Sequence, residues 1–111
     1  MVGDTPRLEL CVGIYRAQQI SGHVVVFADG VHPTNAFQTF LVHESRDPGH
    51  FGVALWHLRS EGPSLHVVTP FAVSASLQTT ERVEHVRVRD AAGDQLVAVE
   101  QVSNAVAAHA R

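Results

Sequence analysis

The chain has 111 residues, a formal net charge of −3 and an apolar fraction of 45%, so it has room for one domain with one hydrophobic core. Its eight basic residues are all arginines, and because they are scattered along the chain, the charge pattern of a nucleic-acid-binding protein is missing. The sequence has no lysine, which excludes Schiff-base chemistry and a phosphate-binding P-loop.

In chain order, short apolar or alternating runs are separated by turn residues, which predicts an all-β domain. The clearest run is 71–79, where the apolar side chains fall on one face, as the two-residue period of a strand requires. The predicted strands cover 8–17, 23–28, 36–43, 51–59, 65–69, 71–79, 83–90 and 95–102.

The first predicted strand contains the single cysteine, Cys11, which cannot form an intrachain disulfide, so the core alone must hold the fold. Leu10 and Val12 share one face of this strand, which places Cys11 on the opposite face with Tyr15. We expect Cys11 to be a buried or half-buried structural thiol, because no cluster of basic residues surrounds it in the sequence.

Turn residues separate the predicted strands at 29–35, 45–49, 61–64 and 90–94. Pro70 divides 65–69 from 71–79, because a proline has no amide hydrogen for a central position in a sheet. The last two strands are predicted to form a hairpin, since 90–94 begins with an aspartate and has a late glycine, as in a type I turn with a bulge.

Short strands about ten residues apart, joined by tight turns, predict an antiparallel β-sandwich of the immunoglobulin-like kind with seven or eight strands. A small antiparallel β-barrel is the alternative. We expect one domain over 1–111, with an ordered core at about 8–102 and a tail, 103–111, that is a frayed helical turn or disordered. The predicted interior consists of Leu10, Val12, Val25, Phe27, Leu55, Phe71, Val73, Leu77, Val86, Val88 and either Leu96 or Val97.

The opening segment, 1–7, lacks the apolar core of a secretion signal, and no apolar run has membrane-spanning length. We therefore expect a cytoplasmic protein whose partners include neither a membrane nor a nucleic acid.

Eight histidines raise the question of a metal site, because imidazole is a ligand of zinc, copper and iron. No two of them have the spacing that puts both rings on one side of a strand or helix, so we expect no metal and no other cofactor.

Catalytic motifs are missing as well, since no G-x-S-x-G marks a nucleophilic serine. The remaining candidates for acid–base chemistry are His32 beside Asp29, with His57 as a third polar group. An ordinary turn, in which the Asp29 side chain bonds its own backbone, is the favoured interpretation of this segment. The sequence therefore favours a protein without catalytic activity.

The strands 36–43 and 51–59 are apolar on both faces, although a two-layer domain has only one interior. We expect the second face to pack against a second copy of the chain in a homodimer, because isologous contacts are the commonest route to an oligomer. A long loop or the tail is the alternative cover. The predicted interface consists of Phe40, Val42, Ala54, Trp56 and Leu58.

Two classes of function follow from these predictions. The first is a non-catalytic binding or assembly module that self-associates through the apolar sheet face and engages a protein or small-molecule partner with its loops. The second is a small β-fold enzyme or ligand-binding protein that uses a dimer cleft or a barrel mouth. Its polar groups would be His32, His57 and Asp29.

Overall fold

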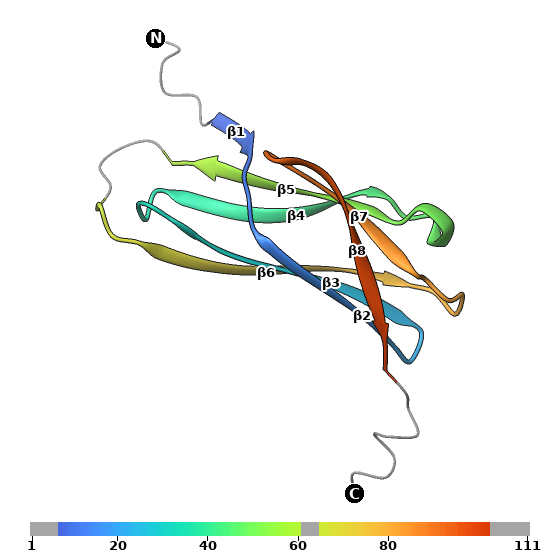
Figure 1. Cartoon of the computed structure of the whole chain (residues 1–111). Coiled ribbons are helices and arrows are strands. Elements are labelled where there is room, and N and C mark those ends of the chain that lie inside the picture. The colour runs from blue at the N-terminus through green and yellow to red at the C-terminus, as the bar shows by residue number, and fades with distance from the viewer. Residues whose placement is uncertain (1–6, 61–64, 103–111) are drawn as a thin grey trace, which may run out of the picture.

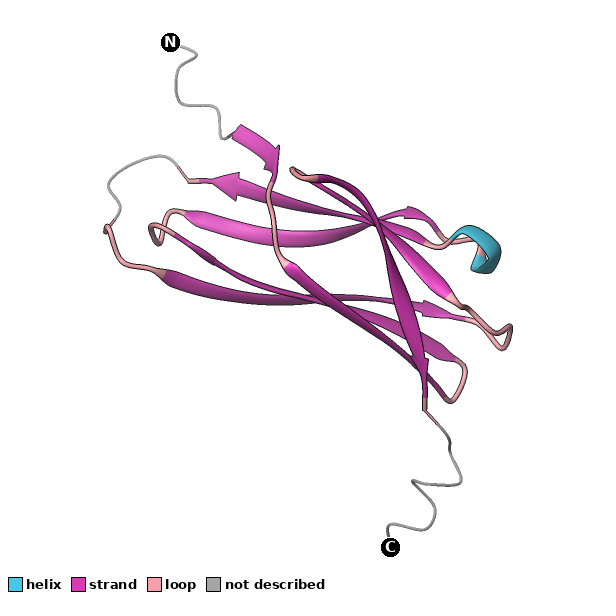
Figure 2. Cartoon of the chain, viewed as in Figure 1, coloured by secondary structure: helices cyan, strands magenta, loops and turns pink. Residues whose placement is uncertain are grey.

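The computed structural model describes residues 7–60 and 65–102 of the chain. Within these residues the regular structure is β-strand apart from one short 3-10 helix, so the prediction of an all-β fold is confirmed (Figure 2). The elements are β1 (Arg7–Leu10), β2 (Ile14–Ile20), β3 (His23–His32), β4 (Phe37–Ser45), η1 (Pro48–His50), β5 (Gly52–Arg59), β6 (Thr69–Gln78), β7 (His85–Asp90) and β8 (Gly93–Gln101).

The strands form one mixed sheet in the order β1-β5-β7-β8-β2-β3-β6, and β4 pairs with the remaining edge of β5. The pairs β2–β8 and β5–β7 are parallel, and the other pairs are antiparallel. The sheet curves into a half-barrel in which β4 and β5 lie opposite β6 and β3 (Figure 1). The finer prediction of an antiparallel, immunoglobulin-like sandwich is not confirmed, because the sheet is mixed.

Strand β8 connects the two halves of the half-barrel. Its first part, 93–98, forms the predicted antiparallel hairpin with β7, and its end, 99–101, runs parallel to β2. The hairpin turn has the expected chemistry, since the Asp90 carboxylate accepts a hydrogen bond from the Ala92 amide at 2.8 Å and Gly93 has a φ of +120°.

The predicted strand 8–17 is wrong as a single element, because the chain changes partner at 11–13. Residues before this break pair with β5, and residues after it pair with β3. Gly13 makes the crossing possible, since a Cβ there would lie 3.0 Å from the Asp29 carbonyl oxygen and 3.1 Å from Leu55. The crossing leaves Cys11 buried inside and Val12 exposed, the reverse of the predicted placement of Val12.

The interior differs from the prediction mainly at β3. The buried residues there are Val24, Val26 and Ala28, whereas Val25 and Phe27 lie half-buried on the outer face. Both faces of this strand are apolar, so the two-residue period alone cannot decide which one faces inward. Leu55, Leu77, Val86 and Val88 are buried as predicted. Phe71 and Val73 are half-buried and pack against the core, and of the two alternatives on β8 it is Val97 that packs against the core while Leu96 is exposed. Leu10 is half-buried on the outer face.

Two strand boundaries also differ from the predicted ones. Strand β6 runs through Pro70, and the predicted strand 65–69 is wrong because 65–68 has no strand pairing. The proline fits because β6 is an edge strand that pairs with β3 alone among the described strands. Strand β3 continues to His32, so most of the predicted loop 29–35 is strand. The predicted turn 61–64 and tail 103–111 lie outside the described residues.

Candidate functional site

The outer surface of β1, β5 and β4 is covered by apolar side chains. The strand register aligns them in three rows, Leu8 with Leu58, Leu10 with Trp56 and Phe40, and Ala54 with Val42. We call this surface the apolar face and define it as Leu8, Leu10, Phe40, Val42, Ala54, Trp56 and Leu58.

Parts of the apolar face are open to solvent. Leu8 is 54% exposed, Phe40 37% and Val42 45%, whereas Trp56 and Leu58 are half-buried and Ala54 is fully buried. Within the described chain no loop covers the exposed members, since they keep these exposed fractions in the folded protomer. Leu8 and Leu10 are absent from the predicted interface, because only the pairing of β1 with β5 brings them beside Leu58 and Trp56.

The charges at the border of the apolar face are paired with each other. The Arg89 guanidinium lies 5.4 Å from the centre of the Trp56 ring, and it forms an ion pair with Glu44 at 2.5 Å. The hydrogen bond from Arg89 holds the pKa of the Glu44 carboxyl below its ordinary value. Glu44 and Arg89 therefore contribute no net charge at this border, although Arg87 of β7 lies near enough to Glu44 to lower its pKa as well.

A second group of interest lies on the inner side of the sheet. His32 at the end of β3 and His57 on β5 have ring centroids 5.4 Å apart. Phe71 stacks on His32 at 4.8 Å, and Phe37 stacks on His57 at 4.4 Å. Gly30 allows this arrangement, because a Cβ on it would lie only 2.5 Å from the Phe71 ring.

The two imidazoles of this aromatic cluster have different polar partners. His32 Nε2 lies 2.6 Å from the Thr39 hydroxyl, and His57 Nε2 lies 3.5 Å from a carboxylate oxygen of Glu9. His57 Nδ1 is buried and has no hydrogen-bond partner among the described residues. Burial, and secondarily the neighbouring His57, lowers the pKa of His32, so its ring is neutral at neutral pH.

The structure thus brings His32 and His57 together but leaves Asp29 apart from them. Asp29 is exposed and lies on the outer face of β3, opposite Ile14 of β2. The carboxylate that approaches the histidines is Glu9 instead. Sequence reasoning missed Glu9 because its position depends on the register between β1 and β5.

The aromatic cluster does not provide the ligands of a typical metal centre. In the part of the chain that the structure describes, no three His, Cys, Asp or Glu side chains converge to hold an ion. The same residues include no helix with the length and hydropathy that crossing a membrane needs. Comparisons of the chain with protein-family models, with curated protein sequences and with solved structures found no match.

Proposed function

We propose that this protein is a non-catalytic binding and assembly module that self-associates through the apolar face. The observation that carries the proposal is the exposure of Phe40 and Val42, which lie in register with Trp56 and Ala54 on the outer surface of β4 and β5. Full burial of one such side chain stabilises a dimer by about 2 kcal/mol. In a two-fold symmetric dimer each residue is buried in both protomers, so each contribution occurs twice.

A second copy of the chain is the occupant that fits this surface. An isologous contact places each residue near its own counterpart, so a charged group at its centre would meet a like charge. The apolar face has no charge at its centre, and Glu44 and Arg89 at its border form an ion pair with each other. The centres of two apolar faces therefore approach without electrostatic repulsion.

Light scattering coupled to size exclusion tests the proposal directly. We expect a mass of twice the 12.0 kDa chain mass at micromolar concentration. A mass of one chain under these conditions contradicts self-association, and leaves a segment outside the described residues as the cover for this surface.

The immunoglobulin-like sandwich and the cytoplasmic location also belong to the proposal. The two facing layers of Figure 1 support the sandwich, while strand β8, which both halves share, favours a barrel in which the β2–β8 and β5–β7 pairs are parallel instead of antiparallel. The net charge of −3 and the scattered arginines support a module whose partners include neither a nucleic acid nor an anionic membrane surface.

The second candidate function is the binding of a small polar molecule at the aromatic cluster. The specific observation in its favour is the buried, unpartnered Nδ1 of His57, since an unmade hydrogen bond at a buried atom costs about 1–3 kcal/mol. Side-chain NMR of the histidines during addition of small hydroxyl or carbonyl compounds tests it. Selective shifts of the His32 and His57 rings support binding, and uniform shifts of all histidines contradict it.

A further inference from the structure

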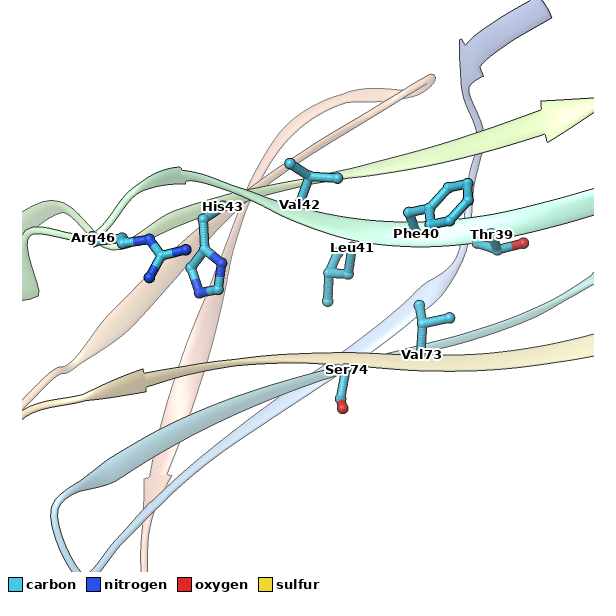
Figure 3. A pocket seen from close by; sticks show the side chains of 8 residues that line it. All are labelled: Thr39, Phe40, Leu41, Val42, His43, Arg46, Val73 and Ser74. Atoms are coloured by element: carbon cyan, nitrogen blue, oxygen red, sulfur yellow. The ribbon is translucent and has the colours of Figure 1, made fainter. Parts of the chain in front are cut away.

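Two pockets on the described surface differ in the chemistry of their lining. The larger, of about 550 Å³, follows the seam between β4 and β6, where Leu41 and Val73 are directed toward each other (Figure 3). The Nε2 of His43 lies 2.7 Å from the Ser76 carbonyl oxygen and ties the two strands together across this seam. The smaller pocket, of about 230 Å³, lies between η1 and the β7–β8 hairpin, at the end of the fold where β5 begins (Figure 1). Its lining is the more polar of the two, which makes it the better candidate for a polar ligand.

Basic side chains from two separate elements line the smaller pocket. His50 is the last residue of η1. His85 and Arg87 lie two residues apart on β7, so both side chains project from the same face of the strand, and both are exposed. The remaining lining residues are Gly49, Phe51 and Leu96. The pocket lining therefore contains an arginine and two imidazoles but no carboxylate.

Backbone contacts hold η1 against β7 at this pocket. The Arg87 amide donates a hydrogen bond to the Phe51 carbonyl oxygen at 2.9 Å. Gly52, the register partner of Arg87 on β5, lies between them, since a Cβ on it would be 3.8 Å from the carbonyl oxygens of both His50 and Arg87. That Cβ would also be 3.9 Å from the Cβ of Arg87, so a side chain at this position would stand beside Arg87. Because Gly52 has none, the space beside the guanidinium stem stays open.

Arg87 differs from Arg89, its neighbour on the same face of β7, in having no bonded partner. The Nε of Arg89 donates to both carboxylate oxygens of Glu44, at 3.2 and 3.0 Å. Arg87 contributes to the lowered pKa of Glu44 through its charge, without a hydrogen bond to it. Among the described residues, the side chains of Arg87, His50 and His85 form neither a hydrogen bond nor an ion pair.

The carboxylates that lie near the pocket along the chain have donors of their own. The Asp47 carboxylate accepts a hydrogen bond from the Gly49 amide at 3.0 Å. The Glu84 carboxylate forms an ion pair with Arg82. The basic groups of the pocket are thus left without a bonded counter-charge, and such a site is complementary to an anion.

The number and origin of the donors favour a phosphate group over a carboxylate. A carboxylate is planar, and one guanidinium fork satisfies both of its oxygens. A phosphate monoester has three terminal oxygens in a tetrahedral arrangement and a charge close to −2 at neutral pH, so it needs donors from several directions. Arg87 supplies a fork, and His50 and His85 supply ring N–H donors from different elements. Leu96, the register partner of Arg87 on β8, is 71% exposed and offers an apolar surface beside them.

We propose that the pocket between η1 and the β7–β8 hairpin binds a small phosphate monoester. Arg87 binds two phosphate oxygens, and His50 and His85 donate hydrogen bonds to the phosphate group. Leu96 contacts the apolar group that the phosphate carries. The pocket belongs to a single protomer, and none of its lining residues is part of the apolar face, so the proposal does not depend on self-association.

Amide NMR of the full chain, titrated with three compounds at constant ionic strength, tests the proposal. Phenyl phosphate should shift the signals of Gly49, Arg87 and Leu96, and should bind at least about threefold more tightly than inorganic phosphate, because only its ring contacts Leu96. Diethyl phosphate is a diester, like the phosphates of nucleic acids and phospholipids, and has one negative charge and two terminal oxygens. It should bind at least about tenfold more weakly than phenyl phosphate. Equal binding of the diester, or shifts no larger than those with sodium chloride, overturn the proposal.

Two variants and a matched control give the second test. Arg87→Gln should weaken phenyl phosphate binding at least about tenfold, because it removes the charged fork. Leu96→Ala should reduce the advantage of phenyl phosphate over inorganic phosphate and leave the binding of inorganic phosphate unchanged. Arg59→Gln, at an exposed arginine of β5 outside the pocket, is the control and should change neither affinity. If Arg59→Gln weakens binding as much as Arg87→Gln does, the attraction comes from the net charge of the chain, and the site assigned to Arg87 is wrong.

Discussion

The hydroxyl of Tyr15 donates a hydrogen bond to the Asp90 carboxylate at 2.5 Å, which connects β2 to the turn between β7 and β8. Asp90 is only 3% exposed, and its carboxylate also accepts hydrogen bonds from the Gln95 side chain and the Ala92 amide. A buried carboxylate is tolerated only when such donors replace water. This contact therefore holds the hairpin against the half of the sheet that contains β2.

Tyr15→Phe should lower the free energy of unfolding by about 1–3 kcal/mol, because it leaves the buried Asp90 carboxylate short of one donor. Urea denaturation followed by circular dichroism measures the change. Arg82→Ala removes an exposed ion pair to Glu84 and is the control, with an expected change within about 0.5 kcal/mol. Similar changes for both variants would contradict the role given to Tyr15.

The Cys11 thiol should be unreactive in the folded protein. Burial, and secondarily the Asp90 carboxylate, raises its pKa to about 11, so almost no thiolate is present at pH 8. We expect a disulfide reagent to modify Cys11 slowly in buffer and rapidly in urea. Fast modification without denaturant means that the chain opens at 11–13.

The same raised pKa predicts a loss of stability at alkaline pH. A group that holds its proton more tightly in the folded state stabilises the fold below its unfolded pKa, here 9.0, and the contribution is lost as the pH rises toward 11. Cys11→Ser lacks this titration in that range. Its melting temperature should therefore fall less between pH 9 and 11 than that of the unmodified chain.

His32 should make the fold sensitive to acid. Its pKa is lowered from the ordinary 6.5, mainly by burial, so protonation favours the unfolded chain. The stabilisation is present above pH 6.5 and is lost as the pH falls through the folded pKa. His32→Phe keeps an aromatic ring between Phe37 and Phe71 without a titrating group, and should flatten the melting temperature between pH 7 and 5. If the melting temperature of His32→Phe falls with pH as steeply as that of the unmodified chain, another group causes the acid sensitivity.

The sequence predicts those features of the fold that depend on residues close together in the chain. The β7–β8 hairpin follows from the aspartate and glycine of its turn, and the inward placement of Leu77 follows from alternation with small polar residues. At β3 the sequence is ambiguous, because Val24 and Val25 are equally apolar and only the opposite layer decides which is buried.

The candidate sites show the same division between local and long-range information. Phe40, Val42 and Trp56 are recognisable as a shared face because they lie on neighbouring strands joined by a short turn. The contact between His32 and His57 depends on the curvature of the whole sheet, and Glu9 reaches His57 through a pairing of the first strand with the fifth. No local pattern encodes these long-range pairings.

Self-association through the apolar face predicts that Val42→Glu converts a dimer into a monomer or causes aggregation. A carboxylate at this position would lose its water at the interface without gaining a partner, which is far more costly than a charge on an exposed surface. Light scattering coupled to size exclusion measures the mass, and circular dichroism confirms that the strands remain.

Ile14→Glu is the matched control for Val42→Glu, because Ile14 is a 77% exposed apolar residue of β2 outside the apolar face. It introduces the same charge and should leave the mass of the dimer unchanged, as should Arg87→Gln at an exposed position of β7. If Ile14→Glu dissociates the dimer and Val42→Glu does not, the protein associates through the half of the sheet that contains β2, and the interface assigned to Phe40, Val42 and Trp56 is wrong.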